Sequence, residues 1–244
     1  MKRESFGSRL GFILVSAGCA IGIGNVWKFP YICGAYGGAA FILIYLCFLV
    51  ILGIPVLVAE FAVGRGSHTS VAKCFDKLAP AGSCWKPLKF IGIIGCYMLM
   101  MFYTTVGGWM IYYCVKSLRG DFVGATPEAV TQSFSDMLGN APTMMLWMVI
   151  ICLIGFAVCF MGLQNGIEKI SKVMMSALLI IMVILAVHSV MMEGAGEGIS
   201  FYLIPDFQKI KEAGVGNVVF AALSQSFFTL SIGIGAMLIF GSYL

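Results

Sequence analysis

The sequence is poor in charged residues and almost without histidine. Charged residues make up 11% of the 244 and only two histidines occur, whereas 60% of the residues are hydrophobic. The mean hydropathy is +0.99. Soluble domains carry roughly a quarter charged residues, so this composition excludes a soluble fold. The sequence shows no serine, histidine and carboxylate arrangement and no metal-type cysteine spacing, so nothing in it indicates an enzyme.

The sequence instead contains long apolar runs. Six of them reach the roughly 17 to 25 residues that a helix needs to cross a bilayer. They predict an all-α integral membrane protein whose residues 1–244 form a single transmembrane domain. The expected spans are Leu10–Cys33, Ala39–Val63, Phe90–Val115, Thr143–Leu163, Val173–Met192 and Val218–Leu244. A short helix is also expected near Pro127–Met137, with Thr126 as its N-cap.

The uneven distribution of basic residues predicts the orientation of the chain. With the N-terminus in the cytoplasm, the inner segments hold most of the lysines and arginines, and the outer segments hold most of the acids. The positive-inside rule then puts both termini in the cytoplasm, as expected for a multi-pass protein of the plasma (inner) membrane. Basic inner segments beside membrane spans account for the positive net charge, so no nucleic-acid partner is expected. The inner basic residues are Lys2, Arg3, Arg9, Arg65, Lys73, Lys77, Lys86, Lys89, Lys169 and Lys172.

Two matched glycine pairs interrupt the first and last of these spans. Gly22-Ile23-Gly24 and Gly233-Ile234-Gly235 each weaken a helix at membrane depth, where free peptide groups must face protein or a polar cavity. Freed N–H groups at the first break can hold a carboxylate, and freed carbonyls before it can coordinate a cation. Asn25 and Thr229 place side-chain oxygens beside the two breaks. Close helix packing is the alternative reading of the glycines, but two matched breaks favour a binding site.

Glu60 is an acid inside the second span. An ionisable group at membrane depth is a functional candidate by default. We expect its carboxyl group to accept N–H groups from the broken sixth helix. The alternative is a side chain that snorkels to the cytoplasmic surface.

Several motifs carry a family resemblance. They are the run Ala17–Tyr31 with its Gly22-Ile23-Gly24, then Gly37–Phe41, Glu60–Arg65, and Gln225–Ala236 with its Gly233-Ile234-Gly235. Together they resemble the neurotransmitter:sodium symporter family in its bacterial form. The resemblance implies the LeuT fold, an all-α inverted-repeat membrane transporter, here as the first repeat plus the sixth helix. In that fold helices 1 and 6 are discontinuous.

The resemblance also implies roles for individual residues. Lys28, where the family usually has arginine, and Phe228 belong to the outer gate, and Glu60 supports the break in the sixth helix. Tyr45, Gln225 and Thr229 resemble half of a chloride site, so chloride is an additional candidate ion. The implied sodium ligands are Gly18, Ala20, Ile21, Asn25 and Thr229. The implied substrate contacts are Ala20, Gly22, Gly24, Leu99, Tyr103, Phe228, Ser231 and Ile234.

Gly22 indicates the class of substrate. Relatives that carry monoamines have an aspartate there, whereas glycine leaves room for a substrate that brings its own carboxylate. The resemblance therefore implies sodium-coupled symport of an amino acid by alternating access, with hydrophobic or aromatic side chains favoured and a homodimer as one option. Proton coupling through a related fold is an alternative.

The family's second repeat is missing from this sequence, so we expect the chain to be a fragment. The alternative is a truncated, non-transporting membrane protein that pairs with a full-length relative.

Overall fold

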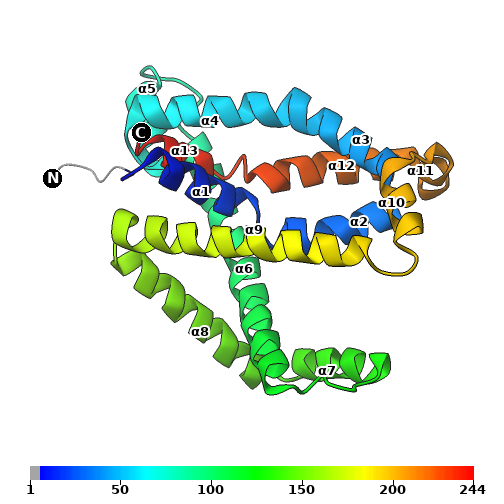
Figure 1. The fold of residues 1–244 in the computed structure, drawn as a ribbon. Coiled ribbons are helices and arrows are strands. Elements are labelled where there is room, and N and C mark those ends of the chain that lie inside the picture. Colours follow the sequence, from blue (N-terminus) through cyan, green and yellow to red (C-terminus); the bar gives the residue numbers. More distant parts are fainter. Residues whose placement is uncertain (1–5) are drawn as a thin grey trace. The chain divides into compact units, whose positions relative to one another are not determined.

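The computed structural model describes residues 6–244, and in that range the chain forms helices and no strand. The basic residues Lys2 and Arg3 lie outside the described residues. The chain divides into two compact units (Figure 1). Unit 1 is Met1–Gly92 with Leu163–Leu244, and unit 2 is Ile93–Gly162.

The first predicted span is a bent helix. α1 (Arg9–Ala20) begins at Ser8, whose hydroxyl oxygen accepts a hydrogen bond from the Gly11 N–H. It ends at the first glycine pair, and the chain resumes as a wider π-helical turn, η1 (Gly24–Lys28), followed by α2 (Phe29–Ala35). The two halves are inclined to each other by 53°. The predicted discontinuity of helix 1 is confirmed.

The second predicted span is continuous. α3 (Ala39–Phe48), the π-helical turn η2 (Leu49–Gly53) and α4 (Ile54–Ser67) form one apolar helix of 29 residues. It ends at His68, which adopts a left-handed conformation with φ 47°. The connector that follows contains α5 (Val71–Leu78).

The last predicted span is divided at the second glycine pair. α12 (Val215–Leu230) stops at Ser231, and α13 (Ala236–Gly241) starts after Gly235, so the predicted span Val218–Leu244 consists of two helices separated by the second glycine pair. Before it, α10 (Ala195–Leu203) and α11 (Phe207–Ala213) cover the segment that joins it to the fifth span. The predicted discontinuity of helix 6 is confirmed.

The fifth span begins earlier than predicted. The π-helical turn η3 (Leu163–Glu168) leads directly into α9 (Lys169–Val190), so the helix starts about ten residues before Val173. Polar residues in the first turns of this helix lower the local hydropathy, so the apolar run alone placed the start of the helix too late. Glu168 is only 3% exposed because its carboxylate is satisfied by groups far away in the sequence.

Unit 1 is held together by close helix packing. Near the second break α13 lies against α4, where a Cβ on Gly64 would overlap the Leu238 carbonyl and a Cβ on Gly241 would lie 2.8 Å from the Phe61 carbonyl. Small residues allow two backbones to approach in this way inside a membrane. The larger core is shared by α2, α3, α11 and α12. Its buried members are Cys33, Ala40, Phe41, Tyr45, Ile210, Val218 and Ala222.

Unit 2 holds the remaining spans. α6 (Leu88–Arg119) enters it from unit 1, and α8 (Ala141–Phe160) packs on it through Gly108, where a Cβ would lie 2.9 Å from the Met148 nitrogen. Between them α7 (Pro127–Gly139) begins where expected, with the Thr126 hydroxyl accepting the Ala129 N–H. The predicted short helix is thus confirmed.

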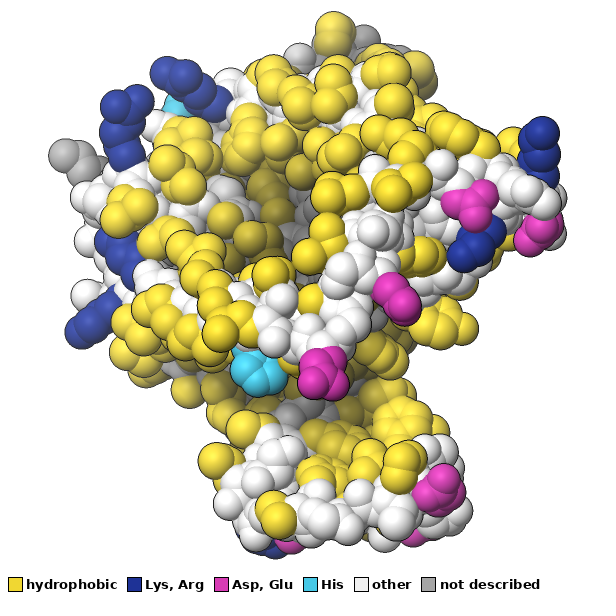
Figure 2. All heavy atoms as spheres, turned by 45° about the vertical axis from the view of Figure 1, so that its right-hand side comes forward, with side chains coloured by type: hydrophobic (Ala, Val, Ile, Leu, Met, Phe, Trp, Pro, Cys, Tyr) yellow, Lys and Arg dark blue, Asp and Glu magenta, His cyan; other side chains and the backbone are white. Residues whose placement is uncertain are grey.

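The surface fits a bilayer environment. Within residues 6–244, four helices are long and apolar enough to cross a membrane, or up to six if each of two bent helix pairs counts as one span. Hydrophobic side chains cover much of the face seen in Figure 2, and Phe160 and Leu179 are 94% and 66% exposed. Large apolar side chains cannot remain in water over such an area, so the chain is a multi-pass membrane protein.

Candidate substrate and sodium site

The first helix break opens the backbone between Ile21 and Ile23. The Ile21 N–H still donates to the Ala17 carbonyl at 2.6 Å, which closes α1. The Gly22 carbonyl then accepts from the Asn25 N–H at 3.0 Å and starts the next turn. Because the helix stops and restarts within three residues, the dipole ends of two half-helices meet at this point.

The second break touches the first one directly. Ser231 ends α12 in a left-handed conformation with φ 50°, and its hydroxyl donates to the Cys19 carbonyl at 2.8 Å. Gly233 and Gly235 have φ values of 89° and 77°, which glycine adopts without strain. The two interrupted helices are thus joined by a hydrogen bond from one break to the end of α1.

A polar cluster lies between the two breaks. The Thr229 hydroxyl donates to Asn25 Oδ1 at 3.0 Å, and the Asn25 amide donates to the Ala20 carbonyl at 2.8 Å. Gln225, which is 2% exposed, holds its amide 3.4 Å from both Asn25 Oδ1 and Thr229 Oγ1 and 3.5 Å from the Gly24 carbonyl. Ala20, Asn25 and Thr229, three of the predicted sodium ligands, therefore meet in one place. Uncharged oxygens of this kind suit a hard monovalent cation.

The geometry gives Gln225 a larger part in the polar cluster than the sequence indicated. The sequence placed it only in a half-site for chloride, together with Tyr45 and Thr229. Tyr45 is buried with its ring centroid 5.0 Å from that of Phe29, in the core that α3 shares with α2 and α12. Gln225 instead bridges residues of both breaks, and its contacts span about 200 positions of sequence.

Phe228 covers the first break. Gly24 is buried, and a Cβ there would overlap the Phe228 ring, so only glycine allows this contact. The Lys28 ammonium lies 5.7 Å from the centroid of the same ring, within cation–π range. Lys28 and Phe228, the two predicted gate residues, are therefore neighbours.

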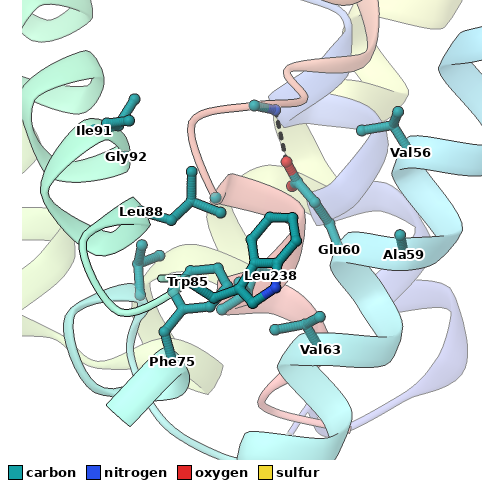
Figure 3. A pocket seen from close by; sticks show the side chains of 13 residues that line it. Val56, Ala59, Glu60, Val63, Phe75, Trp85, Leu88, Ile91, Gly92 and Leu238 are labelled. Carbon is teal, nitrogen blue, oxygen red and sulfur yellow. Dashed lines mark hydrogen bonds between the residues drawn. The ribbon is translucent and has the colours of Figure 1, made fainter. Parts of the chain in front are cut away.

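Glu60 points from α4 toward the second break (Figure 3). Its Oε1 accepts the Gly233 N–H at 2.6 Å, while Oε2 is buried and has no hydrogen-bond partner among the described residues. Beside it lies an apolar cavity of about 470 Å³, lined by Trp85, Phe75 and Leu88 among others. The expected contact between the Glu60 carboxyl group and the freed backbone of the sixth helix is present.

Gly18 and Ile21 are placed differently from the other predicted sodium ligands. They face an apolar groove between α1 and α9 that is also lined by Met175 and Ser171. A Cβ on Gly18 would lie 3.1 Å from Met175 Sδ, so α1 and α9 approach closely here. The polar cluster at Asn25 does not include these two residues.

The remaining predicted substrate contacts fall in two places. Ile234 lies in the turn of the second break and is half-buried, as Gly22 is in the first. Leu99 and Tyr103 are half-buried residues of α6 and belong to unit 2.

The sequence pattern does not single out Glu168, yet its carboxylate accepts hydrogen bonds from three other residues. Its oxygens accept from the Gly7 N–H at 2.8 Å, the Ser8 hydroxyl at 3.1 Å and Lys172 at 2.7 Å. A buried acid in an otherwise apolar protein was the available clue. Its partners at Gly7 and Ser8 are about 160 residues away and could not be read from spacing.

Fold and site together define a class of protein. Two helices broken at facing positions, with backbone groups, side-chain oxygens and a cation–π lid between them, are the architecture of an α-helical membrane transporter of the inverted-repeat type.

Comparison with known proteins agrees with this class. The model of the sodium:neurotransmitter symporter family matches residues 3–134 and 128–244. The chain is 36% identical over 243 residues to the uncharacterized sodium-dependent transporter YhdH of Bacillus subtilis, covering 100% of this chain and 53% of that protein. It is 29% identical to the sodium-dependent serotonin transporter of Drosophila melanogaster, covering 99% of this chain and 43% of that one.

A solved structure agrees as well. The crystal structure of MhsT in complex with L-phenylalanine superposes with a TM-score of 0.89 at 37% identity, over 99% of this chain and 54% of MhsT. The chain belongs to the sodium:neurotransmitter symporter family, whose members are transporters and not enzymes, and it has the LeuT fold. It spans about half the length of the curated relatives it matches.

Proposed function

We propose that this chain forms the part of a sodium-coupled amino-acid symporter in which two broken helices hold the substrate and the ions. The observation that carries the proposal is the polar cluster of Ala20, Asn25, Thr229 and Gln225 between the breaks. A sodium ion would take the position between these oxygens that the Thr229 hydrogen bond now closes. Gly18 and Ile21 would offer carbonyl oxygens to a second sodium ion from the end of α1.

The substrate carboxylate would bind the N–H groups of the first break, near Gly22 and Gly24. The side chain of the substrate would lie along Ser231 and Ile234, with Phe228 as the lid. Leu99 and Tyr103 of α6 are further substrate contacts that the family resemblance implies. An amino acid with a hydrophobic or aromatic side chain fits this set best, because the surrounding groups are apolar apart from the two breaks. The similarity to MhsT, solved with L-phenylalanine, supports the same class.

The remaining features of the proposal follow from the sequence pattern. The protein would lie in the plasma membrane with its N-terminus in the cytoplasm, as the distribution of lysine and arginine favours. Tyr45, Gln225 and Thr229 would form one side of a chloride site if the transporter requires chloride. A homodimer is compatible with the apolar surface.

The test is binding of radiolabelled phenylalanine to the longest open reading frame that contains this chain, purified in detergent. Binding in sodium that is lost when choline replaces sodium, and that leucine or tryptophan displaces, is the expected result. Sodium-dependent binding of a monoamine without competition by these amino acids would overturn the substrate class. A stop codon after Leu244, together with no binding, would favour the non-transporting protein that pairs with a full-length relative.

A further inference from the structure

Glu168 lies against the start of α1 although it belongs to the start of the fifth span. Its carboxylate is buried, with 3% of the residue exposed, and accepts hydrogen bonds from the Gly7 N–H and the Ser8 hydroxyl. Ser8 in turn caps α1 by accepting the Gly11 N–H at 3.0 Å. One carboxylate thus bonds both the backbone before α1 and the residue that caps it.

The fit between this carboxylate and α1 depends on a missing side chain. Gly11 is buried, and a Cβ there would overlap the Glu168 carboxylate. The positive end of the α1 dipole faces the negative charge, which stabilises the contact further. Lys172, one turn along α9, is the only ion-pair partner that Glu168 has among the described residues, at 2.7 Å.

The same two helices carry the groove toward which Gly18 and Ile21 turn. α1 is short, so fixing its first turn fixes the direction in which its last carbonyls point. Near its far end α1 is held by Met175 against Gly18 and by the Ser231 hydroxyl on the Cys19 carbonyl. The contact at Glu168 is the polar anchor at the opposite end of α1.

We propose that Glu168 is a positioning residue, which anchors the start of α1 to α9 and thereby holds the Gly18 and Ile21 carbonyls where the second sodium ion would bind. The role of these carbonyls rests on the proposed function, whereas the anchoring of α1 does not. Loss of the anchor lets α1 move away from α9 and opens the groove between them. Cys19 lines that groove and reports on its opening.

The experiment measures alkylation of Cys19 by N-ethylmaleimide in the protein made from the longest open reading frame that contains this chain, purified in detergent and read peptide by peptide by mass spectrometry. Glu168→Ala is expected to raise the rate at Cys19 by about tenfold or more, because charge-assisted hydrogen bonds of this kind control local opening by such factors. Glu168→Gln, which keeps one acceptor, should lie between Glu168→Ala and the unaltered chain. Glu197→Gln, at an exposed acid of α10, is the control and should leave the rate unchanged.

Gly11→Ala provides an independent second variant. Alanine favours helix formation over glycine, so an effect on Cys19 cannot come from a weaker helix and must come from displacement of the carboxylate. Gly216→Ala, at a helical glycine with open space around it, is the matched control. If Glu168→Ala and Gly11→Ala both leave the Cys19 rate within about twofold of the unaltered chain, the anchor does not exist.

A sodium arm separates the inference from the proposed function. Sodium that slows alkylation of Cys19 in the unaltered chain, and no longer does so in Glu168→Ala, supports both. Faster alkylation in the variants without any effect of sodium on either protein supports the anchor and counts against the sodium site.

Discussion

At the scale of single residues, the site depends on uncharged polar side chains that form hydrogen bonds with one another. Asn25 Oδ1 accepts from Thr229 at 3.0 Å and from Gln225 at 3.4 Å, so no full charge is needed to hold the two breaks together. Such a cluster can break one of its hydrogen bonds and bind a cation instead at a small cost in free energy.

Thr229→Val tests this cluster, because valine keeps the shape of threonine and removes its hydroxyl. We expect the protection by sodium against thermal unfolding to weaken, with sodium affinity falling about tenfold for one lost oxygen ligand. Thr131→Val, at an exposed position of α7, is the control. Equal sodium protection in Thr229→Val and the unaltered chain would contradict the assignment of Thr229 as a ligand.

Glu60 is the second residue whose contribution can be measured directly. Glu60→Ala removes the acceptor of the Gly233 N–H and should lower the free energy of unfolding by about 1 to 3 kcal/mol. Glu60→Gln retains an acceptor oxygen and should lose much less. The measurement is thermal unfolding of the two variants. Equal losses of stability in both would reject the role of Glu60 as a hydrogen-bond acceptor.

At the scale of helices, the glycines of the first break differ in what they permit. Gly24→Ala should destabilise the protein by about 1 to 3 kcal/mol, because its Cβ would overlap the Phe228 ring. Gly34→Ala, in α2 with open space around it, should be neutral or stabilising by up to about 1 kcal/mol. The measurement is the unfolding temperature of both variants, and a harmless Gly24→Ala would show that Phe228 does not pack there.

Much of this arrangement could be predicted from the sequence, for reasons that differ between helices. Apolar length defined the spans, and the paired glycines located both breaks, because these features act within a few neighbouring residues. The start of the fifth span was predicted wrongly at Val173. The turns before it contain Glu168, whose burial is made possible by Gly7 and Ser8, and hydropathy cannot register such distant partners.

At the scale of the whole molecule, the chain combines a strongly apolar surface with a short basic connector between the second and third spans. Lys89 pairs with Asp76 at 2.6 Å and Lys77 donates to the Ser67 carbonyl at 2.7 Å, so part of this connector is tied to the fold. It also carries Cys74, which is fully buried, and Cys84, which is exposed. These two thiols can report on both the orientation and the integrity of the protein.

Burial raises the pKa of the Cys74 thiol, so the folded protein keeps this proton at pH values where the unfolded chain loses it. Its contribution to stability is complete below about pH 8.5, the ordinary pKa of a thiol, and is lost as the pH rises through the raised pKa. Thiolate is the reactive form. Cys74 should therefore resist maleimide at pH 7 to 8 until the protein is unfolded, whereas Cys84 should react in the folded protein.

The same pair of thiols tests the orientation. With the N-terminus in the cytoplasm, a membrane-impermeant maleimide should fail to label Cys84 in intact cells and should label it in inverted membrane vesicles. Cys74 should remain unlabelled in both preparations, and its labelling after denaturation confirms that the reagent is active. Labelling of Cys84 in intact cells would show that the orientation is the opposite one. The start of α1 at Glu168 would then face the outside of the cell.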